Sequence, residues 1–169
     1  MARSQANLVL MPAARYAAEQ MNRSLKIPYL YLPVSYRLET IDEQYRQIHQ
    51  MLLSQRNGDA FDLEIPRMRA SQAIEKARSA VGDTPVIVDA SATAHPFDLA
   101  RALMEYGFSV RRIAAQECPA CDQDNMRWVM EHHPDVMSLV GSPVPMVIGS
   151  DLEGIAAELE ARTHIPCFG

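Results

Sequence analysis

The stretch NLVLMPAARYAAEQMNRSLKIPYLYLP, residues 7–33, decides the fold, and VPMVIGSDLEGIAAELEARTHIPCFG, residues 144–169, repeats its organisation. Each stretch holds a short apolar strand, a turn, an amphipathic helix that contains Ala-Ala-Glu, and an Ile-Pro step into another short strand. Repeated strand–helix–strand units are typical of parallel α/β proteins. The two stretches are separated by roughly the length of a small domain, whereas solenoid repeats recur every ~20–50 residues. The sequence therefore predicts that the chain consists of the end of one α/β domain joined to most of a second.

Residue patterns divide the chain into three parts. The first, residues 1–39, is predicted to be a partial α/β unit, the second, residues 40–83, to hold connecting helices, and the third, residues 84–169, to be a nearly complete α/β domain. Thr40 and Glu43 have the spacing of a capping box, which predicts that the first connecting helix begins at Thr40. The chain is long enough for one full core and part of another.

Strands and helices alternate regularly in the third part. Short apolar runs predict strands at 86–88, 109–113, 136–140 and 145–148, separated by amphipathic helical patterns. Right-handed crossovers between such strands give a Rossmann-like α/β fold, with a parallel sheet flanked by helices. The side chains expected in its core are those of Val86, Val88, Leu103, Val136, Val140, Val147 and Leu159.

Composition excludes several classes of protein. The net charge of -5 and the scattered Lys and Arg residues give no basic surface for a phosphate backbone, so no nucleic-acid partner is expected. No apolar run approaches the about 18 residues of a membrane span, so no membrane partner is expected. The three cysteines form no disulfide framework, and the sequence predicts a cytoplasmic protein.

Polar residues follow two of the predicted strands. Ser91, Thr93 and His95 come after the strand at 86–88, and Ser150 comes after the strand at 145–148. Ligands of open α/β sheets bind at the carboxyl ends of the strands, so these four residues are the candidates for cofactor binding. Simpler interpretations stay open, because Ser150 can serve as a helix cap and His95, before a proline, as a turn residue.

The motif Cys118-Pro-Ala-Cys121 lies between a predicted strand and a predicted helix. A helix N-terminus can activate a thiol, so the two cysteines can form a redox dithiol. A zinc site is a weaker alternative, because the adjacent His132 and His133 lack the usual spacing of three to five residues between His ligands. A surface loop that holds two cysteines is the third interpretation. The sequence predicts no metal site, with Cys118 and Cys121 as weak candidates.

The order of these elements resembles a known family. The chain resembles the nitrogenase component 1 type oxidoreductases. The resemblance rests on a strand and helix followed by Ile-Pro, then a crossing helix, and on the stretches VIVDASATAHPFDLARALMEYGFSV at 86–110, HHPDV at 132–136 and VIGSDLEGIAAELEARTHIPCFG at 147–169. That family includes the dinitrogenase subunits, their cofactor-assembly scaffold and the light-independent protochlorophyllide reductase. Its subunits contain three Rossmann-like domains, and the resemblance implies that this chain is the end of the second and most of the third.

The resemblance implies a role in redox chemistry. Family members receive electrons from a nucleotide-dependent reductase and pass them through an iron–sulfur cluster, whose thiolates lie mainly in the first domain. In dinitrogenase, the loop that matches residues 89–95 carries a glycine pair and an arginine against the metal cofactor. The present loop, Asp-Ala-Ser-Ala-Thr-Ala-His, has neither Gly nor Arg. The iron–sulfur or metal cluster is therefore implied for the parent complex, and no cofactor is expected in the isolated chain.

Two function classes follow from these patterns. In the first, the chain is a fragment or domain of a nitrogenase-like oxidoreductase that contributes to the metal-cofactor or substrate-binding part and to subunit association, and is inactive alone. Its expected partners are a second copy of itself or a nitrogenase-like subunit, together with the reductase. In the second, the chain is a small α/β ligand-binding or regulatory module without catalysis.

Overall fold

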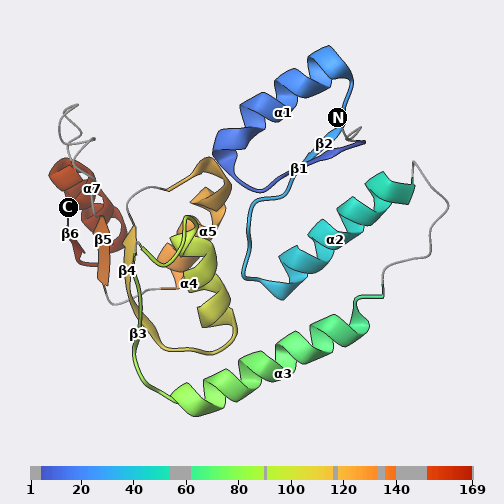
Figure 1. The fold of residues 1–169 in the computed structure, drawn as a ribbon. Coiled ribbons are helices and arrows are strands. Elements are labelled where there is room, and N and C mark those ends of the chain that lie inside the picture. Colours follow the sequence, from blue (N-terminus) through green and yellow to red (C-terminus); the bar gives the residue numbers. More distant parts are fainter. Residues whose placement is uncertain are drawn as a thin grey trace. The chain divides into compact units, whose positions relative to one another are not determined.

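The computed structural model describes residues 5–53, 62–89, 91–115, 118–132, 136–139 and 152–168. The fold is α/β, as the sequence predicted, with short parallel strands flanked by helices (Figure 1). The chain forms two units, residues 1–68 and residues 69–169. The expected boundaries at 39/40 and 83/84 stay a prediction.

The first unit contains the strand–helix–strand stretch that opens the chain. Its elements are β1 (Asn7–Val9), α1 (Pro12–Leu25), β2 (Tyr29–Tyr31) and α2 (Leu38–Leu53). The two strands pair in parallel, with Asn7 opposite Tyr29 and Val9 opposite Tyr31. α1 begins with Pro12, whose missing N–H costs nothing in a first helical turn, and it ends at Lys26 in the left-handed conformation, φ 56°.

The capping box predicted at Thr40 is wrong. α2 begins at Leu38, so Thr40 already lies inside the helix, and its Oγ1 accepts a hydrogen bond from Arg37 Nη1 at 3.5 Å. The turn before α2 is held instead by Ser35, whose Oγ accepts the Arg37 N–H at 3.2 Å. Farther along the helix, the largely buried Asp42 forms an ion pair with Arg67, 2.7 Å from Nη1 to Oδ2.

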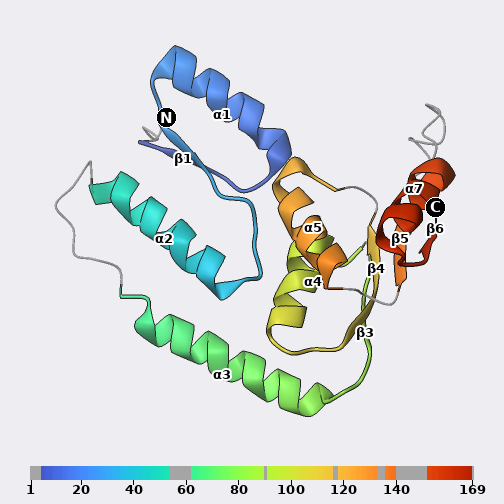
Figure 2. The same cartoon turned by 180° about the vertical axis from the view of Figure 1, so that it is seen from behind.

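The second unit is built on a four-stranded parallel sheet in the order β3-β4-β5-β6. Its elements are β3 (Val86–Val88), α4 (Pro96–Glu105), β4 (Val110–Ala115), the short 3-10 helix η1 (Ala120–Asp122), α5 (Gln123–Glu131), β5 (Val136–Leu139), α7 (Leu152–Thr163) and β6 (Cys167–Phe168). α4 and α5 lie beside β3 and β4, and α7 lies beside β5 and β6 (Figures 1 and 2). The helix before this sheet, α3 (Glu64–Val81), has no buried residue.

The core of the second unit differs in part from the predicted one. Val88 is 2% exposed, as expected, whereas Val86, Leu103 and Leu159 are only partly buried against the core. The predicted side chains of Val136, Val140 and Val147 lie outside the described residues. The most buried core side chains are Ala100, Val129 and Ile113, at most 1% exposed. The small Ala100 lets α4 approach the sheet closely, which leaves the larger leucines at the margin of the core.

The end of α4 has the geometry expected of a glycine stop. Gly107 has φ 82°, and the Phe108 N–H donates to the Leu103 carbonyl at 2.9 Å. This is the hydrogen bond of a Schellman motif, in which a residue beyond the helix satisfies an otherwise unpaired carbonyl. The motif turns the chain from α4 into β4.

Candidate functional site

The structure brings two loops to the same end of the sheet. The loop that begins at Asp89 follows β3, and the segment that begins at Cys118 follows β4. Because β3 and β4 are parallel neighbours, their carboxyl ends meet at one edge. Ser91, Thr93, His95, Cys118 and Cys121 all come from these two segments. Ser150 lies outside the described residues, so the structure describes one part of the predicted edge.

Two of the predicted site residues shape their own loop. Asp89 Oδ1 accepts hydrogen bonds from the Ser91 N–H at 2.9 Å and from the Ser91 hydroxyl at 2.5 Å. Thr93 Oγ1 accepts the His95 N–H at 3.0 Å. Asp, Ser and Thr side chains commonly fold turns in this way. The Thr93 hydroxyl therefore holds the backbone of His95, and the Ser91 hydroxyl holds the turn that begins at Asp89.

His95 is the buried centre of the site. It is 3% exposed, its Nδ1 lies 3.7 Å from the Cys121 Sγ, and its Nε2 has no hydrogen-bond partner within the described part of the chain. A buried imidazole nitrogen without a partner costs free energy, so native structures contain few of them. His95 is thus more than a turn residue, because its ring reaches a segment 26 residues farther along the chain.

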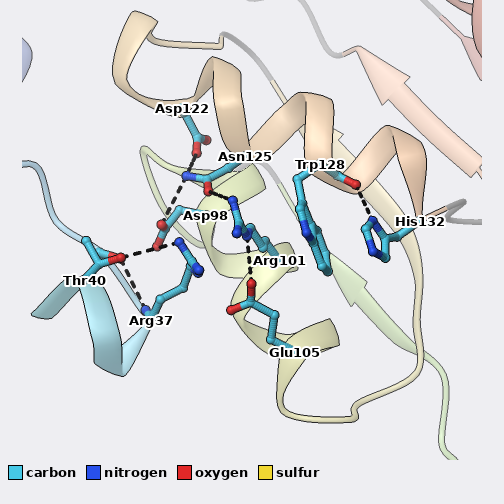
Figure 3. A network of polar contacts seen from close by, with 10 residues as sticks. Arg37, Thr40, Asp98, Arg101, Glu105, Asp122, Asn125, Trp128 and His132 are labelled. Carbon is cyan, nitrogen blue, oxygen red and sulfur yellow. Dashed lines mark hydrogen bonds and ion pairs between the residues drawn. The ribbon is translucent and has the colours of Figure 1, made fainter.

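Asp122 joins the two loops and is fully buried. Its Oδ2 accepts the Phe97 N–H at 3.0 Å, which caps the first turn of α4 from another segment, and its Oδ1 accepts from Asn125 Nδ2 at 3.1 Å. The same Asn125 amide nitrogen donates to Asp98 Oδ1 at 3.1 Å (Figure 3). Burial raises the pKa of Asp122 above its usual range, although the hydrogen bonds from Asn125 and Phe97 oppose the shift.

A second group of side chains locks α4 to α5. Arg101 donates through Nε to Glu105 at 2.8 Å and through Nη1 to Asn125 Oδ1 at 3.3 Å. Its guanidinium also lies over the Trp128 ring, 4.9 Å from the ring centroid, and the ring of Trp128 stacks on His132 at 3.7 Å (Figure 3). Because Arg101 donates to the Asn125 amide oxygen, the amide nitrogen is oriented toward the carboxylates of Asp98 and Asp122.

The three cysteines have different surroundings. Cys118 and Cys121 are partly buried, and burial, together with the charges of Asp122 and Cys121, raises the pKa of Cys118 to about 11. Cys167 is buried inside the sheet, where its thiol contacts the Ile165 carbonyl at 3.2 Å. Cys167 pairs with Met137, which pairs with Ile113, so it lies level with the middle of β4 and away from the edge that Cys118 follows.

The number and placement of the cysteines bear on an iron–sulfur site. A cluster of the usual kind requires four thiolates, and the chain has three cysteines, of which Cys167 lies in the core. Within the described ranges no three His, Cys, Asp or Glu side chains gather so that they could hold a metal ion. Of the two residues weighed for zinc, His132 approaches the Trp128 carbonyl through Nδ1 at 2.8 Å, and His133 lies outside the described residues.

Sequence reasoning missed the polar network beneath the site. Asp122 and Asn125 are three residues apart and share one helical face, a spacing that could have marked them as partners. Their contacts with Phe97 and Asp98 join positions 25 and 27 residues apart, which no local pattern reveals.

Comparisons with known proteins bear on the chain as a whole. Among the described residues, no helix is both long and apolar enough to cross a membrane. No curated protein and no solved structure matches the chain. The sequence profile of the nitrogenase component 1 type oxidoreductases matches residues 1–138 of the 169. On that match, with the parallel α/β fold, the chain belongs to the nitrogenase component 1 type oxidoreductase family.

Proposed function

We propose that the chain is a fragment or domain of a nitrogenase-like oxidoreductase, contributes to the part of the complex that binds the metal cofactor or substrate, and is inactive alone. The observation that carries the binding role is the buried His95 imidazole, whose Nε2 has no partner in the described residues. A ligand or a neighbouring subunit that hydrogen-bonds this nitrogen would offset a cost of about 1–3 kcal/mol. Ser91 and Thr93 support this role by holding the loop in place, and Ser150 is proposed as a further contact.

The position of His95 in the family pattern supports the same role. By resemblance, its loop is similar to the dinitrogenase loop that lies against the metal cofactor, but it lacks that loop's glycine pair and arginine, and we propose that His95 is the polar contact here. An imidazole can donate or accept a hydrogen bond, so it can contact either an anionic ligand or a donor group. We assign His95 this hydrogen-bonding contact and not the role of a metal ligand.

The cluster of the complex would be held elsewhere. With three cysteines, of which Cys167 lies in the core apart from Cys118 and Cys121, the chain lacks a four-thiolate set, and we propose that other segments or subunits supply the missing ligands. When bound, such a cluster supplies one-electron transfer. The proposed partners are a second copy of the chain or a nitrogenase-like subunit, and a nucleotide-dependent reductase, in the cytoplasm.

A comparison of two preparations tests this proposal. When the tagged chain is purified without oxygen from its own source cells, a partner subunit and iron are expected to co-purify with it. The same chain produced alone, with iron and sulfide supplied, should hold no stoichiometric cluster. In the complex, His95→Gln should lower substrate reduction without lowering the yield of complex, and the exposed Arg127→Gln serves as the matched control.

Two results would overturn the proposal. About four irons per chain in the isolated protein, seen by iron analysis and electron paramagnetic resonance, would make the chain a redox unit in itself. A colourless chain that brings no partner from its own cells and binds a small anion would instead favour the ligand-binding or regulatory module.

A further inference from the structure

The Cys-Pro-Ala-Cys segment supports a chemistry that the proposed function does not use. We propose that Cys118 and Cys121 form a redox-active dithiol, in which Cys121, beside the His95 imidazole, attacks the disulfide of a thiol compound and Cys118 then closes an internal disulfide. The co-substrate is a small-molecule or protein disulfide. This inference is independent of the nitrogenase-like complex, because it requires neither a cluster nor a partner subunit.

The backbone places the two thiols around one tight turn. Pro119 is extended, with φ -56° and ψ 150°, and the turn closes with the Asp122 N–H donating to the Pro119 carbonyl at 2.8 Å. Cys118 lies directly before this turn and Cys121 lies inside it. A disulfide requires Cα atoms about 4.4–6.8 Å apart, a spacing that a turn between residues three apart can supply. Both thiols are free and partly exposed, so a disulfide reagent can reach them.

His95 is placed to take the proton of Cys121. Its Nδ1 lies 3.7 Å from the Cys121 Sγ, a distance within reach of a sulfur hydrogen bond. A thiol beside a base is the usual arrangement of an activated cysteine nucleophile. Nε2 is buried and has no partner among the described residues, so no protein acceptor there fixes the ring as one tautomer. Asp122 interacts electrostatically with His95 and can balance the charge of the imidazolium that forms.

The surroundings of Cys118 assign it the second step. Burial and the nearby charges of Asp122 and Cys121 raise the pKa of Cys118 to about 11, so at neutral pH it is a poor first nucleophile. Once Cys121 is bound in a mixed disulfide, its negative charge is gone and one cause of that raised pKa is removed. Cys118 lies three residues before Cys121, at the start of the same turn, so it can then attack the Cys121 sulfur.

The steps balance in atoms and electrons. The Cys121 thiol gives its proton to His95, its sulfur attacks one sulfur of RS–SR, and the S–S bond breaks to leave Cys121–S–S–R and RS⁻, which takes the proton from His95 as RSH. The Cys118 sulfur then attacks Cys121, loses its proton to the second RS⁻, and forms the internal disulfide. One disulfide is reduced to two RSH while two protein thiols are oxidised.

Thiol counting after treatment with glutathione disulfide tests the inference on the full chain. The protein is equilibrated without oxygen, denatured, and labelled with a maleimide that retards it on a gel. Wild type is expected to change from three reactive thiols to one, and a Cys167→Ser variant from two to none. Cys118→Ser should hold one glutathione on Cys121, as seen by mass spectrometry, and Cys121→Ser should react at least ~10-fold more slowly.

His95→Gln separates the proposed base from a merely structural residue. It should slow the first reaction with glutathione disulfide by about 10-fold or more and leave the final thiol count unchanged. If His95→Gln does not fold, the Cys118→Ser variant still tests the inference, because it keeps His95 and should retain glutathione on Cys121. Three free thiols in wild type under excess glutathione disulfide would overturn the inference. So would a disulfide found only between two chains, or a Cys118→Ser variant that retains no glutathione.

Discussion

Asp122 is the residue on which the two loops of the site depend. It is fully buried, and its oxygens accept hydrogen bonds from the Phe97 N–H and the Asn125 amide. Asp122→Ala leaves the buried Phe97 N–H without this acceptor and leaves the Asn125 amide with Asp98 alone, so we expect the free energy of unfolding to fall by about 1–3 kcal/mol in urea titrations. Asp124→Ala, at a side chain that is 88% exposed, should change it by less than about 1 kcal/mol. Equal losses in the two variants would contradict the assigned role.

The raised pKa of Asp122 also predicts a dependence of stability on pH. Because burial raises the pKa in the folded state, the folded chain keeps the proton at pH values where the unfolded chain, with an ordinary pKa near 3.8, has released it. The free energy of unfolding that Asp122 contributes is therefore largest below pH 3.8 and decreases as pH rises through the folded pKa. The difference between wild type and Asp122→Asn should shrink over this range. If the stability difference between wild type and Asp122→Asn grew with pH instead, folding would lower the pKa of Asp122, which would contradict this prediction.

The thiol of Cys118 should react slowly with alkylating agents. A pKa of about 11, against 9.0 for an unperturbed thiol, lowers the thiolate fraction at pH 8 by roughly 100-fold. Iodoacetamide labelling, followed on the Cys118 peptide by mass spectrometry, should be slower in the folded chain by about that factor than in urea. Rates that agree within about 3-fold would show that the surroundings of Cys118 do not retain its proton.

At the scale of elements, α7 tests how the sheet is covered. The spacing of its apolar residues predicts a buried stripe of Leu152, Ile155, Ala156 and Leu159. The structure buries Ala156 to 3% exposure, partly buries Leu159 and leaves Ile155 48% exposed, and the side chain of Leu152 lies outside the described residues. The prediction for Ile155 is therefore wrong. The buried face of α7 is narrow, because the small Ala156 side chain lets the helix lie close to β5 and β6. At that distance little room remains for large side chains between the helix and the sheet.

This arrangement predicts opposite responses at neighbouring positions of α7. Ala156→Leu inserts three carbons into a closed core and should lower the free energy of unfolding by about 1–3 kcal/mol. Ile155→Ala removes an exposed side chain and should change it by less than about 0.5 kcal/mol. Urea unfolding of both variants measures the difference. A larger loss for Ile155→Ala than for Ala156→Leu would place the helix in a different rotation.

Local patterns predicted elements better than they predicted contacts. The Ile-Pro step predicted before a short strand is confirmed at Ile27-Pro28, which precedes β2. The ends of α4 also follow local signals, since Pro96 begins the helix and Gly107 follows its end. The start of α2 was missed, because the helix already begins at Leu38, where Ser35 holds the preceding turn by accepting the Arg37 N–H. The loop after β3 lies at the carboxyl end of a parallel sheet, as the predicted topology requires, and a ligand site there stays a prediction.

The chemistry of the site was less accessible from sequence. The burial of His95 depends on residues some 25 positions away, and only the folded sheet brings them together. Asp122 caps α4 from 25 residues away, and no local pattern marks it for this role. Long-range contacts of this kind leave no periodic pattern in the chain. The resemblance to the family, by contrast, rested on the order of elements, and the family match confirms it.

For the whole molecule, the two units differ in what holds them together. All the buried residues of the main core cluster lie between Val88 and Cys167, within the second unit. In the first unit, the sheet described is a pair of strands of three residues each. A two-stranded sheet is marginal in water unless it packs against more structure. The second unit is therefore expected to supply most of the cooperativity of unfolding.

Two fragments of the chain test this expectation. Residues 69–169 alone should show helical circular dichroism and one cooperative thermal transition, because the core cluster is retained. Residues 1–68 alone should be largely unfolded at low concentration and gain structure on association, because the sheet described there has only two short strands. Light scattering should accordingly show self-association of the full chain but not of residues 69–169. A stable, folded monomer of residues 1–68 would contradict this, since a sheet of two short strands would then suffice without a partner.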